Sequence, residues 1–383
     1  MATATNITIK DEMTPPNQAG DVLLEKTSAD DPEKRSVDKS VDVDELLGKE
    51  LESIKLTNSS NESTKSKVPA TPPNPYFEFR QLPDRGISIF AKASIPRGAL
   101  ITAERPLMRV TKAHYMAEHV EEAVERLPAD DKKKFWSLAS AHGQDRSKYP
   151  SRIHPDVAEH EKNRIRQQHA ARTSSSPTAL SIFMTNAMEC ENGAAVFETA
   201  ARFNHSCIPN AFFSWNTIKH EERIYASRAI EADEEITLSY CDPFYEFSQR
   251  QWELQHYGFV CVCPACVNLD DVESFGAESR ERRFRLAELD EGTSYPGTFA
   301  DVLRGKIEMA KLMREEGLSG TCLGDNYLSI ARLVANAQSP DFNFAHKAAT
   351  QALDVYTTCL GADSEKAIEA AKSVRAFEKQ MKK

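Results

Sequence analysis

Three cysteines stand within six residues of the chain: Cys261, Cys263 and Cys266. Thiolates this close together can share one tetrahedral zinc ion, provided that a fourth ligand arrives from another part of the sequence. A fold that satisfies this cluster must bring two distant segments together. No other feature of the sequence restricts the fold as strongly.

The sequence offers three candidates for the fourth ligand, namely Cys207, Cys241 and His256. Cysteine is the softer and commoner partner for a set of three thiolates. Cys207 also lies in a turn-forming stretch, 204–210, that can lie beside the cluster. We therefore predict a zinc site made by Cys207 and the three clustered cysteines. Four protein ligands leave no open position for a reacting water, so this zinc would be structural.

The chain has 383 residues and a formal net charge of −10. That length has room for two folded domains or one elaborated domain. No stretch approaches the roughly 18 apolar residues of a membrane helix, and the N-terminus lacks a secretory pattern. We therefore expect a soluble protein inside the cell, with reduced thiols and no membrane contact. The acidic balance argues against direct nucleic-acid binding, which lysine and arginine drive.

Residues 1–73 are rich in acidic residues, serine, threonine and lysine, and almost free of aromatic residues. This composition cannot bury enough apolar surface to offset the entropy of ordering the chain, so we predict a disordered acidic N-terminal tail. A short helix is possible at 41–48, although an isolated helix of that length is marginal. Folded structure is expected to begin near Asn74.

Short β-branched runs predict strands in the region that follows the tail. The runs at 86–91 and 100–103 are separated by a turn signal at 95–98, and together they predict a β-hairpin. Further strands are predicted at 182–184, 212–215, 223–230 and 236–240.

Helix formers dominate two parts of the chain. Residues 113–180 predict a helical insert, and residues 278–383 predict a helical C-terminal domain with hairpins at 300–336 and 344–379. We therefore expect an α+β protein. Its β-rich domain, over 74–268, contains the insert and the cysteine cluster and precedes the helical domain.

Three ordered strings in the β-rich region indicate the family. They are Gly86-Ile-Ser-Ile-Phe-Ala, Asn204-His-Ser-Cys-Ile-Pro-Asn and Glu235-Ile-Thr-Leu-Ser-Tyr, and the cysteine cluster follows them. Their order and spacing resemble those of the SET-domain protein lysine methyltransferases, in particular the SMYD-like subgroup without a MYND zinc finger. The resemblance covers about 75–268. It implies a β-rich SET domain with a helical insertion and a zinc-bound post-SET segment, followed by the helical domain.

The resemblance implies a binding site for S-adenosylmethionine. Asn204 and His205 match the family's cofactor-contacting pair, and Phe259 matches the aromatic residue that packs on the adenine. Tyr240 matches the tyrosine at the methyl-transfer site and is the predicted catalytic residue. The predicted cofactor-binding residues are Gly86, Ile87, Ser88, Asn186, Asn204, His205, Tyr240 and Phe259.

The implied activity is methyl transfer to a lysine side chain of a protein. A lysine amine attacks only when it is neutral, and an apolar channel favours the neutral form by penalising the charged one. The resemblance also implies histone tails as possible substrates, a role as a chromatin regulator, and a place in the nucleus, the cytoplasm or both. We expect a monomer. The alternative is a non-catalytic SET-fold scaffold, against which the joint presence of Asn204, His205 and Tyr240 argues.

One position departs from the family pattern. The family's first motif has two glycines that flank one residue and let the backbone approach the cofactor, whereas the second of them is Ser88 here. The added side chain is expected to weaken cofactor binding at most.

Overall fold

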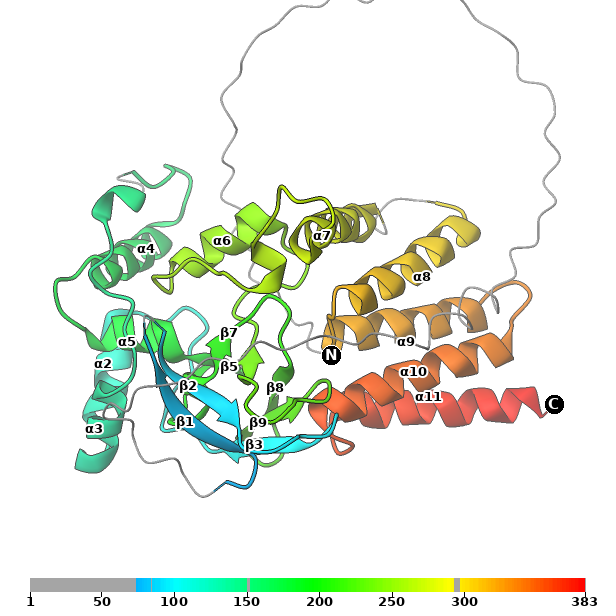
Figure 1. Cartoon of the computed structure of the whole chain (residues 1–383), viewed down its shortest axis with the longest axis horizontal. Coiled ribbons are helices and arrows are strands. Elements are labelled where there is room, and N and C mark those ends of the chain that lie inside the picture. Colours follow the sequence, from blue (N-terminus) through cyan, green and yellow to red (C-terminus); the bar gives the residue numbers. More distant parts are fainter. Residues whose placement is uncertain (1–73, 84, 150–151, 293–296, 383) are drawn as a thin grey trace, which may run out of the picture. The chain divides into compact units, whose positions relative to one another are not determined.

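The computed structural model describes residues 74–83, 85–149, 152–292 and 297–382. The predicted acidic tail and its possible helix at 41–48 lie outside the described residues. Strands occupy the first part of the described chain together with a group of helices, and helices alone occupy its last part (Figure 1). The α+β fold class is therefore confirmed.

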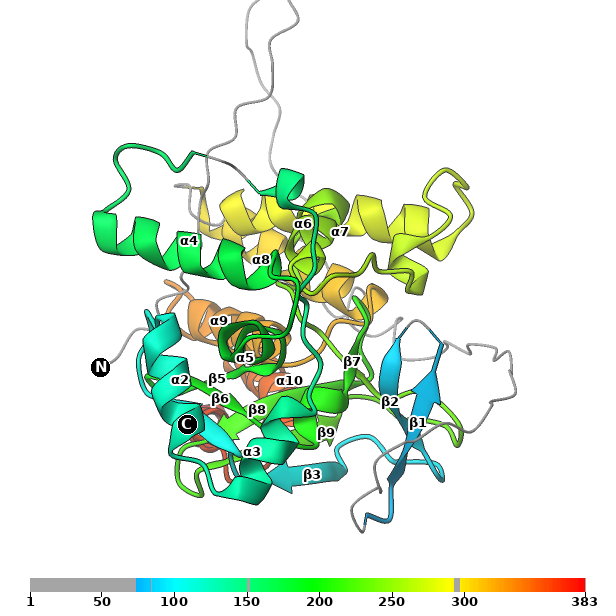
Figure 2. The same ribbon diagram turned by 90° about the vertical axis from the view of Figure 1, so that its left-hand side faces the viewer.

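The strands of the described residues form four small sheets (Figure 2). In sheet order they are β1 (Phe77–Leu82) with β2 (Gly86–Ala91); β3 (Leu100–Glu104), β9 (Glu221–Ala226) and β8 (Ala211–Asn216); β4 (Met108–Val110), β6 (Gly193–Val196) and β5 (Met188–Cys190); and β7 (Asn204–His205) with β10 (Thr237–Leu238). Only the last pair is parallel, and it joins two of the three family strings.

The predicted hairpin between 86–91 and 100–103 is wrong. β2 instead pairs with β1, from Phe77 opposite Ala91 to Leu82 opposite Gly86, and β3 pairs with β9. The turn signal at 95–98 is real, but it attaches to the end of β9, where the Gly98 amide donates to the carbonyl of Ala226 at 2.8 Å. A local turn signal does not identify the strand that a segment pairs with.

Helices fill the stretch that was predicted as an insert. They are α2 (Ala117–Glu125), α3 (Ala129–Trp136), the short η1 (Arg146–Lys148), α4 (Glu159–Arg172) and α5 (Ala179–Asn186). The predicted strand at 182–184 is wrong because these residues lie within α5. Thr178 and Ser181 form a reciprocal capping box that starts this helix. Its apolar run is a buried helical surface, which periodicity alone does not separate from a buried strand.

Buried aromatic residues anchor the chain just before the second family string. Phe203 and Phe77 are both fully buried, and their ring centroids lie 6.1 Å apart. They belong to the apolar cluster beneath β1, β2, β3 and β9. A short helical turn, η2 (Ala200–Arg202), leads into Phe203. The position of Asn204 is therefore fixed by the interior of the β-rich region.

Helices make up the rest of the described chain. They are α6 (Phe247–Gln255), the short η3 (Pro264–Cys266), α7 (Phe275–Gly292), α8 (Phe299–Glu315), α9 (Thr321–Ala335), α10 (Phe342–Leu360) and α11 (Glu365–Met381). Both predicted helical hairpins are confirmed, as α8 with α9 and α10 with α11. Among the described residues, no helix combines the length and apolar character needed to cross a membrane.

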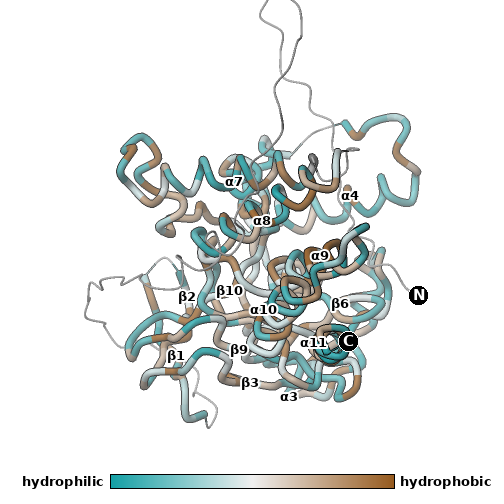
Figure 3. The backbone as a smooth tube through the Cα atoms, turned by 90° about the vertical axis from the view of Figure 1, so that its right-hand side faces the viewer, coloured by the Kyte–Doolittle hydropathy of each residue, from teal (hydrophilic) through white to brown (hydrophobic). Residues whose placement is uncertain are grey.

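The helices α9 and α10 approach each other closely. A Cβ atom added at Gly324 would meet the ring of Tyr356 at 2.4 Å, so only glycine fits at that position without movement. Figure 3 shows hydrophobic stretches along α9, and the buried alanines of α10 lie against it. The helix α10 also packs on β8 and β9.

One buried ion pair connects the C-terminal helices to the β-rich region. The side chains of Arg283 on α7 and Glu316 after α8 are both fully buried and lie 2.8 Å apart. Arg283 also donates to the backbone carbonyls of Cys207 and Pro243, each at 2.5 Å. The helical part therefore holds the second family string directly.

A second buried ionisable side chain has no such partner. Glu222 on β9 is fully buried, and neither of its carboxyl oxygens meets a donor in hydrogen-bonding geometry. Burial raises its pKa to about 8, the charge of Glu104 adds to the rise, and the nearby backbone amide of Arg223 offsets part of it. The carboxyl group is therefore largely protonated at neutral pH.

We expect Arg283→Met to lower the free energy of unfolding by about 3–5 kcal/mol, because it removes the cation beside a buried carboxylate. The matched control is Arg285→Met on the same helix, which removes a half-exposed pair with Glu308 and should cost less than about 1 kcal/mol. Urea denaturation measures both. Equal losses would show that the buried pair does not hold the helices in place.

The buried Glu222 predicts a specific pH dependence. Its folded pKa of about 8 lies above the ordinary 4.5, so its contribution to stability is complete below pH 4.5 and is lost as the pH rises through 8. Glu222→Gln keeps the neutral form at every pH. Between pH 5 and pH 8.5, the wild type should therefore lose on the order of 4 kcal/mol more free energy of unfolding than the variant. Parallel curves in urea titrations at the two pH values would contradict this.

Candidate functional site

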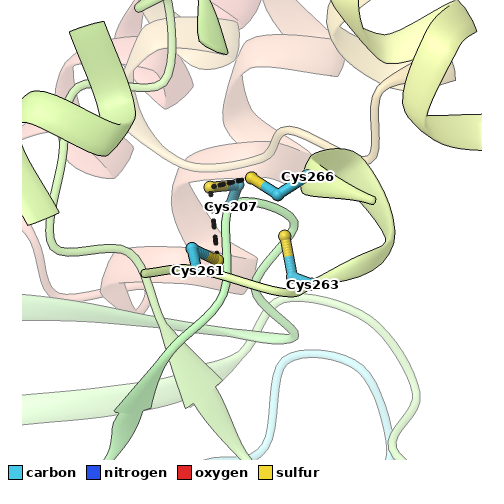
Figure 4. A group of neighbouring side chains, drawn as sticks. All are labelled: Cys207, Cys261, Cys263 and Cys266. Atoms are coloured by element: carbon cyan, nitrogen blue, oxygen red, sulfur yellow. Dashed lines mark hydrogen bonds between the residues drawn. The ribbon is translucent and has the colours of Figure 1, made fainter. Parts of the chain in front are cut away.

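The structure brings together four cysteines from two distant segments. Cys207 follows β7, whereas Cys261, Cys263 and Cys266 lie after α6, and all four sulfurs are within 4.8 Å of one another (Figure 4). The sulfur of Cys207 is 3.5 Å from that of Cys266 and 3.9 Å from that of Cys261. The choice of Cys207 from the sequence therefore agrees with the geometry.

The donor set fits a tetrahedral metal ion. Four thiolates bound at about 2.3 Å to zinc would lie roughly 3.8 Å apart, close to the separations seen here. The pKa of Cys263 is lowered, first by its hydrogen bond with Cys207, whereas the pKa of each of the other three thiols is raised, so one thiolate is favoured before a metal binds. The fully buried guanidinium of Arg250 lies 3.6 Å from the sulfur of Cys266 and also favours negative charge there.

The two other candidates for the fourth ligand occupy different surroundings. Cys241 lies near Cys207 in a second group, whose third member is His205. His256 belongs to neither group, and its ring contacts those of Tyr149 and Trp252. Cys207 is therefore the ligand atom that the triplet shares with the second family string.

His205 is tied to the segment that carries Tyr240. The strands β7 and β10 run parallel, with Leu238 opposite His205, and the backbone amide of Tyr240 donates to Nδ1 of His205 at 2.9 Å. The other ring nitrogen lies 3.2 Å from the sulfur of Cys207. Burial lowers the pKa of His205 to about 4, so the ring is neutral. It acts as a fixed acceptor within the site.

Tyr240 also contacts the segment that carries His205. Its hydroxyl donates to the backbone carbonyl of Phe203 at 2.5 Å. Its ring centroid is 4.9 Å from that of Tyr257, 5.3 Å from that of His205 and 6.5 Å from that of Phe259. Burial, then the charge that Tyr257 would carry, raise the pKa of Tyr240 well above its usual range. The hydroxyl is therefore neutral and held in a fixed direction.

Ser88 and Asn204 are in direct contact. The amide nitrogen of Asn204 donates to the hydroxyl of Ser88 at 2.6 Å and to the carboxylate of Glu235 at 2.9 Å. The other oxygen of that carboxylate accepts from Arg85 at 2.8 Å. The first, second and third family strings therefore meet at one asparagine.

The other predicted cofactor residues are less closely connected. Gly86 and Ile87 lie on β2 just before Ser88, and Gly86 has a φ of +68°, which favours glycine. Asn186 is buried at the end of α5, and its amide donates to the carbonyls of Ala139 and Ile182, both at 2.7 Å. The structure thus joins Ser88 to the group of Asn204, whereas the hydrogen bonds of Asn186 run within the helical insert.

Two contributors to the site were missed in the sequence. Glu235 stands in the acidic run 233–235, and its only distinguishing signal was its place at the start of the third family string. Arg283 lies in a helical segment with many charged residues, and nothing in the sequence separates it from Arg282 or Arg285. Both residues act through long-range contacts, which local patterns do not contain.

Comparisons with known proteins agree with the three strings. Residues 86–241 match the SET domain family. The histone-lysine N-methyltransferase set5 of Schizosaccharomyces pombe is 29% identical over 313 residues, which are 79% of this chain and 85% of that protein. A putative SET domain-containing protein, L678, of Acanthamoeba polyphaga mimivirus is 37% identical over 89 residues, 23% of this chain and 34% of that protein.

A solved structure of Rubisco LSMT bound to AdoMet aligns over 80% of this chain and 84% of its own, at 14% identity. Its TM-score of 0.32 is too low to support conclusions about the site. The family match spans all three strings, from Gly86 to just beyond Tyr240. Residues 86–241 of this chain are therefore similar to the SET domain family.

Proposed function

We propose that the protein transfers a methyl group from S-adenosylmethionine to lysine side chains of other proteins. The observation that carries this proposal is the junction of Asn204, His205 and Tyr240, with Tyr240 hydrogen-bonded at both its amide and its hydroxyl. The name of one relative, the histone-lysine N-methyltransferase set5 of Schizosaccharomyces pombe, supports the same reaction.

The cofactor would lie against the three family strings. Asn204 and His205 contact it by side chain and backbone, Phe259 packs on the adenine, and the backbone of 86–88 borders it. Asn186 stays in the proposal as a further contact, although its amide hydrogens are used by backbone carbonyls, so only its oxygen is left to accept. When bound, S-adenosylmethionine supplies an electrophilic methyl group on a sulfonium.

The chain's own residues position the amine and exclude water. The lysine nitrogen must arrive neutral, and its lone pair forms the new C–N bond as the C–S bond breaks. The resulting ammonium then releases a proton to water. Tyr240, Tyr257 and Phe259 surround this position with aromatic rings that disfavour a charged amine. The neutral, fixed hydroxyl of Tyr240 orients the amine and stabilises the transferring methyl through its oxygen.

The four cysteines are proposed to hold a structural zinc ion. Four thiolates fill a tetrahedral coordination sphere, so no position remains for a reacting water. The metal would clamp the segment with Asn204 and His205 to the one with Phe259. Loss of zinc should therefore loosen the adenine contact together with the rest of the site.

The substrate is proposed to be a protein with an exposed lysine, with histone tails as the first candidates because of the names of the relatives. A basic tail also suits a chain with a net charge of −10. Action on histones places the protein in the nucleus, as a chromatin regulator, and a cytoplasmic pool would serve other substrates. The proposal involves no direct contact with nucleic acid, and a monomer suffices for it. The SMYD-like subgroup stays a prediction from the sequence.

We expect Tyr240→Phe to lower methyl transfer on the order of 100-fold, because the hydroxyl oxygen acts on the transition state. Binding of S-adenosylmethionine should stay near that of the wild type. Calorimetry measures binding, and transfer of labelled methyl to histones and to lysate proteins measures the rate. Tyr76→Phe, on the edge of the β-rich interior, is the matched control.

Two outcomes of this experiment contradict the proposal. A wild type that binds no S-adenosylmethionine would leave the non-catalytic scaffold as the function. An unchanged transfer rate in Tyr240→Phe would remove Tyr240 from the active site.

Elemental analysis should find about one zinc per chain, and Cys207→Ser should lower that content and the affinity for S-adenosylmethionine. Cys322→Ser, which changes a free cysteine on α9, should retain both. Full zinc content in Cys207→Ser would show that another residue supplies the fourth ligand, and Cys241 would be tested next. Absence of zinc from the wild type would rule out the metal.

A further inference from the structure

The second family string contains two asparagines, each of which contacts a glutamate at the start of the third string or just before it. The amide nitrogen of Asn210 donates to the carboxylate of Glu234 at 2.9 Å and to the carbonyl of Glu235 at 2.8 Å. Its side-chain oxygen accepts from the backbone amide of Thr237 at 2.8 Å. Every polar atom of the Asn210 amide is therefore used inside the protein, as expected of a structural residue.

Asn204 differs from Asn210 in one atom of its side-chain amide, the oxygen. Both hydrogens of its amide are used, on Ser88 at 2.6 Å and on Glu235 at 2.9 Å. Within the part of the chain that the structure describes, its side-chain oxygen accepts no hydrogen bond. Asn204 is half-buried, whereas Ser88 is fully buried. The amide thus retains one acceptor, at the junction of the three family strings.

The two partners of Asn204 determine which atom of its side-chain amide is left without a hydrogen bond. An ionised carboxylate only accepts hydrogen bonds, so the reversed amide would place an oxygen against the oxygen of Glu235. Arg85 donates a charge-assisted hydrogen bond to the other carboxylate oxygen at 2.8 Å. The hydroxyl of Ser88 accepts the second amide hydrogen in the same orientation. Glu235 therefore fixes the direction of the amide, and Ser88, whose hydroxyl can also donate, helps to fix its location.

We propose that Ser88 and Glu235 are positioning residues that make the side-chain oxygen of Asn204 the atom presented to a hydrogen-bond donor of S-adenosylmethionine. This inference rests on the proposed function. It reverses the expectation from the sequence, in which Ser88 weakens cofactor binding. In place of the glycine of the family pattern, Ser88 supplies a hydrogen bond that a glycine lacks.

Ser88→Gly decides between the two views because they predict opposite signs. If Ser88 orients Asn204, the variant should bind S-adenosylmethionine about 3- to 10-fold more weakly, the effect of one neutral hydrogen bond. If Ser88 obstructs the cofactor, Ser88→Gly should bind more tightly. Ser88→Ala, which loses the hydroxyl but keeps the Cβ, should weaken binding as much as Ser88→Gly. Calorimetry at fixed pH measures all three proteins.

Glu235→Gln tests the orientation itself. Its amide can donate as well as accept, so the reversed Asn204 is no longer penalised. The variant should raise KM for S-adenosylmethionine 3- to 10-fold with kcat within about twofold, because the amide acts in binding. A purely structural role would instead lower the apparent kcat through loss of folded protein and leave KM unchanged. Arg85→Gln removes the ion pair but leaves both partners of Asn204, and it should change KM less than Glu235→Gln.

Glu234→Gln is the matched control, since it alters the partner of the structural asparagine. It should lower the thermal midpoint without changing the affinity of the folded protein for S-adenosylmethionine. Equal or tighter binding by Ser88→Gly, or an unchanged KM in Glu235→Gln, overturns the inference. Failure of the wild type to bind S-adenosylmethionine overturns the proposed function instead, so the two failures are distinguishable.

Discussion

The backbone at Cys207 is held from three sides, and the rest of the site depends on this. Its sulfur lies in the group of four thiols, its carbonyl accepts from the buried Arg283, and β7 just before it pairs with β10. Each contact comes from a different part of the chain. The positions of Asn204, His205 and Ser206 therefore depend on the cysteine cluster, the C-terminal helices and the β-rich interior together.

This arrangement explains why the C-terminal helices are structurally coupled to the β-rich region. Arg283 reaches the carbonyls of Cys207 and Pro243, and its charge is balanced by Glu316, which also accepts from Ser279 and Arg282. A buried ion pair is costly unless its remaining hydrogen bonds are satisfied. Here these bonds are made to the segment that carries the site. Packing of α7 on α8 is thus coupled to the position of Asn204 and His205.

The sequence was sufficient where chemistry is local, and insufficient where it depends on a distant partner. Cys207 lies far from the triplet in the sequence, and its place as fourth ligand stays a prediction, made because three clustered thiols require a fourth. The α8–α9 and α10–α11 hairpins were predictable because helical periodicity lies within each helix. The strand partner of 100–104 was not, since a turn signal at 95–98 does not say that β9 lies beside it. The helix α5 was missed because Ile182 and Phe183 are buried all round and lack periodicity. Ser88 was interpreted against a family pattern, and its contact with Asn204 exists only in three dimensions.

The hydrogen bonds around His205 also limit the chemistry that the site can perform. One ring nitrogen accepts from the amide of Tyr240 and the other faces the sulfur of Cys207, so neither is left to take a proton from an incoming amine. Tyr240 is neutral, and its hydroxyl hydrogen is donated to Phe203. Neither of these groups serves as a general base. In the proposed reaction the neutral amine would then come from desolvation against the rings of Tyr240, Tyr257 and Phe259, so the proposed site would work by position and exclusion of water rather than by proton abstraction.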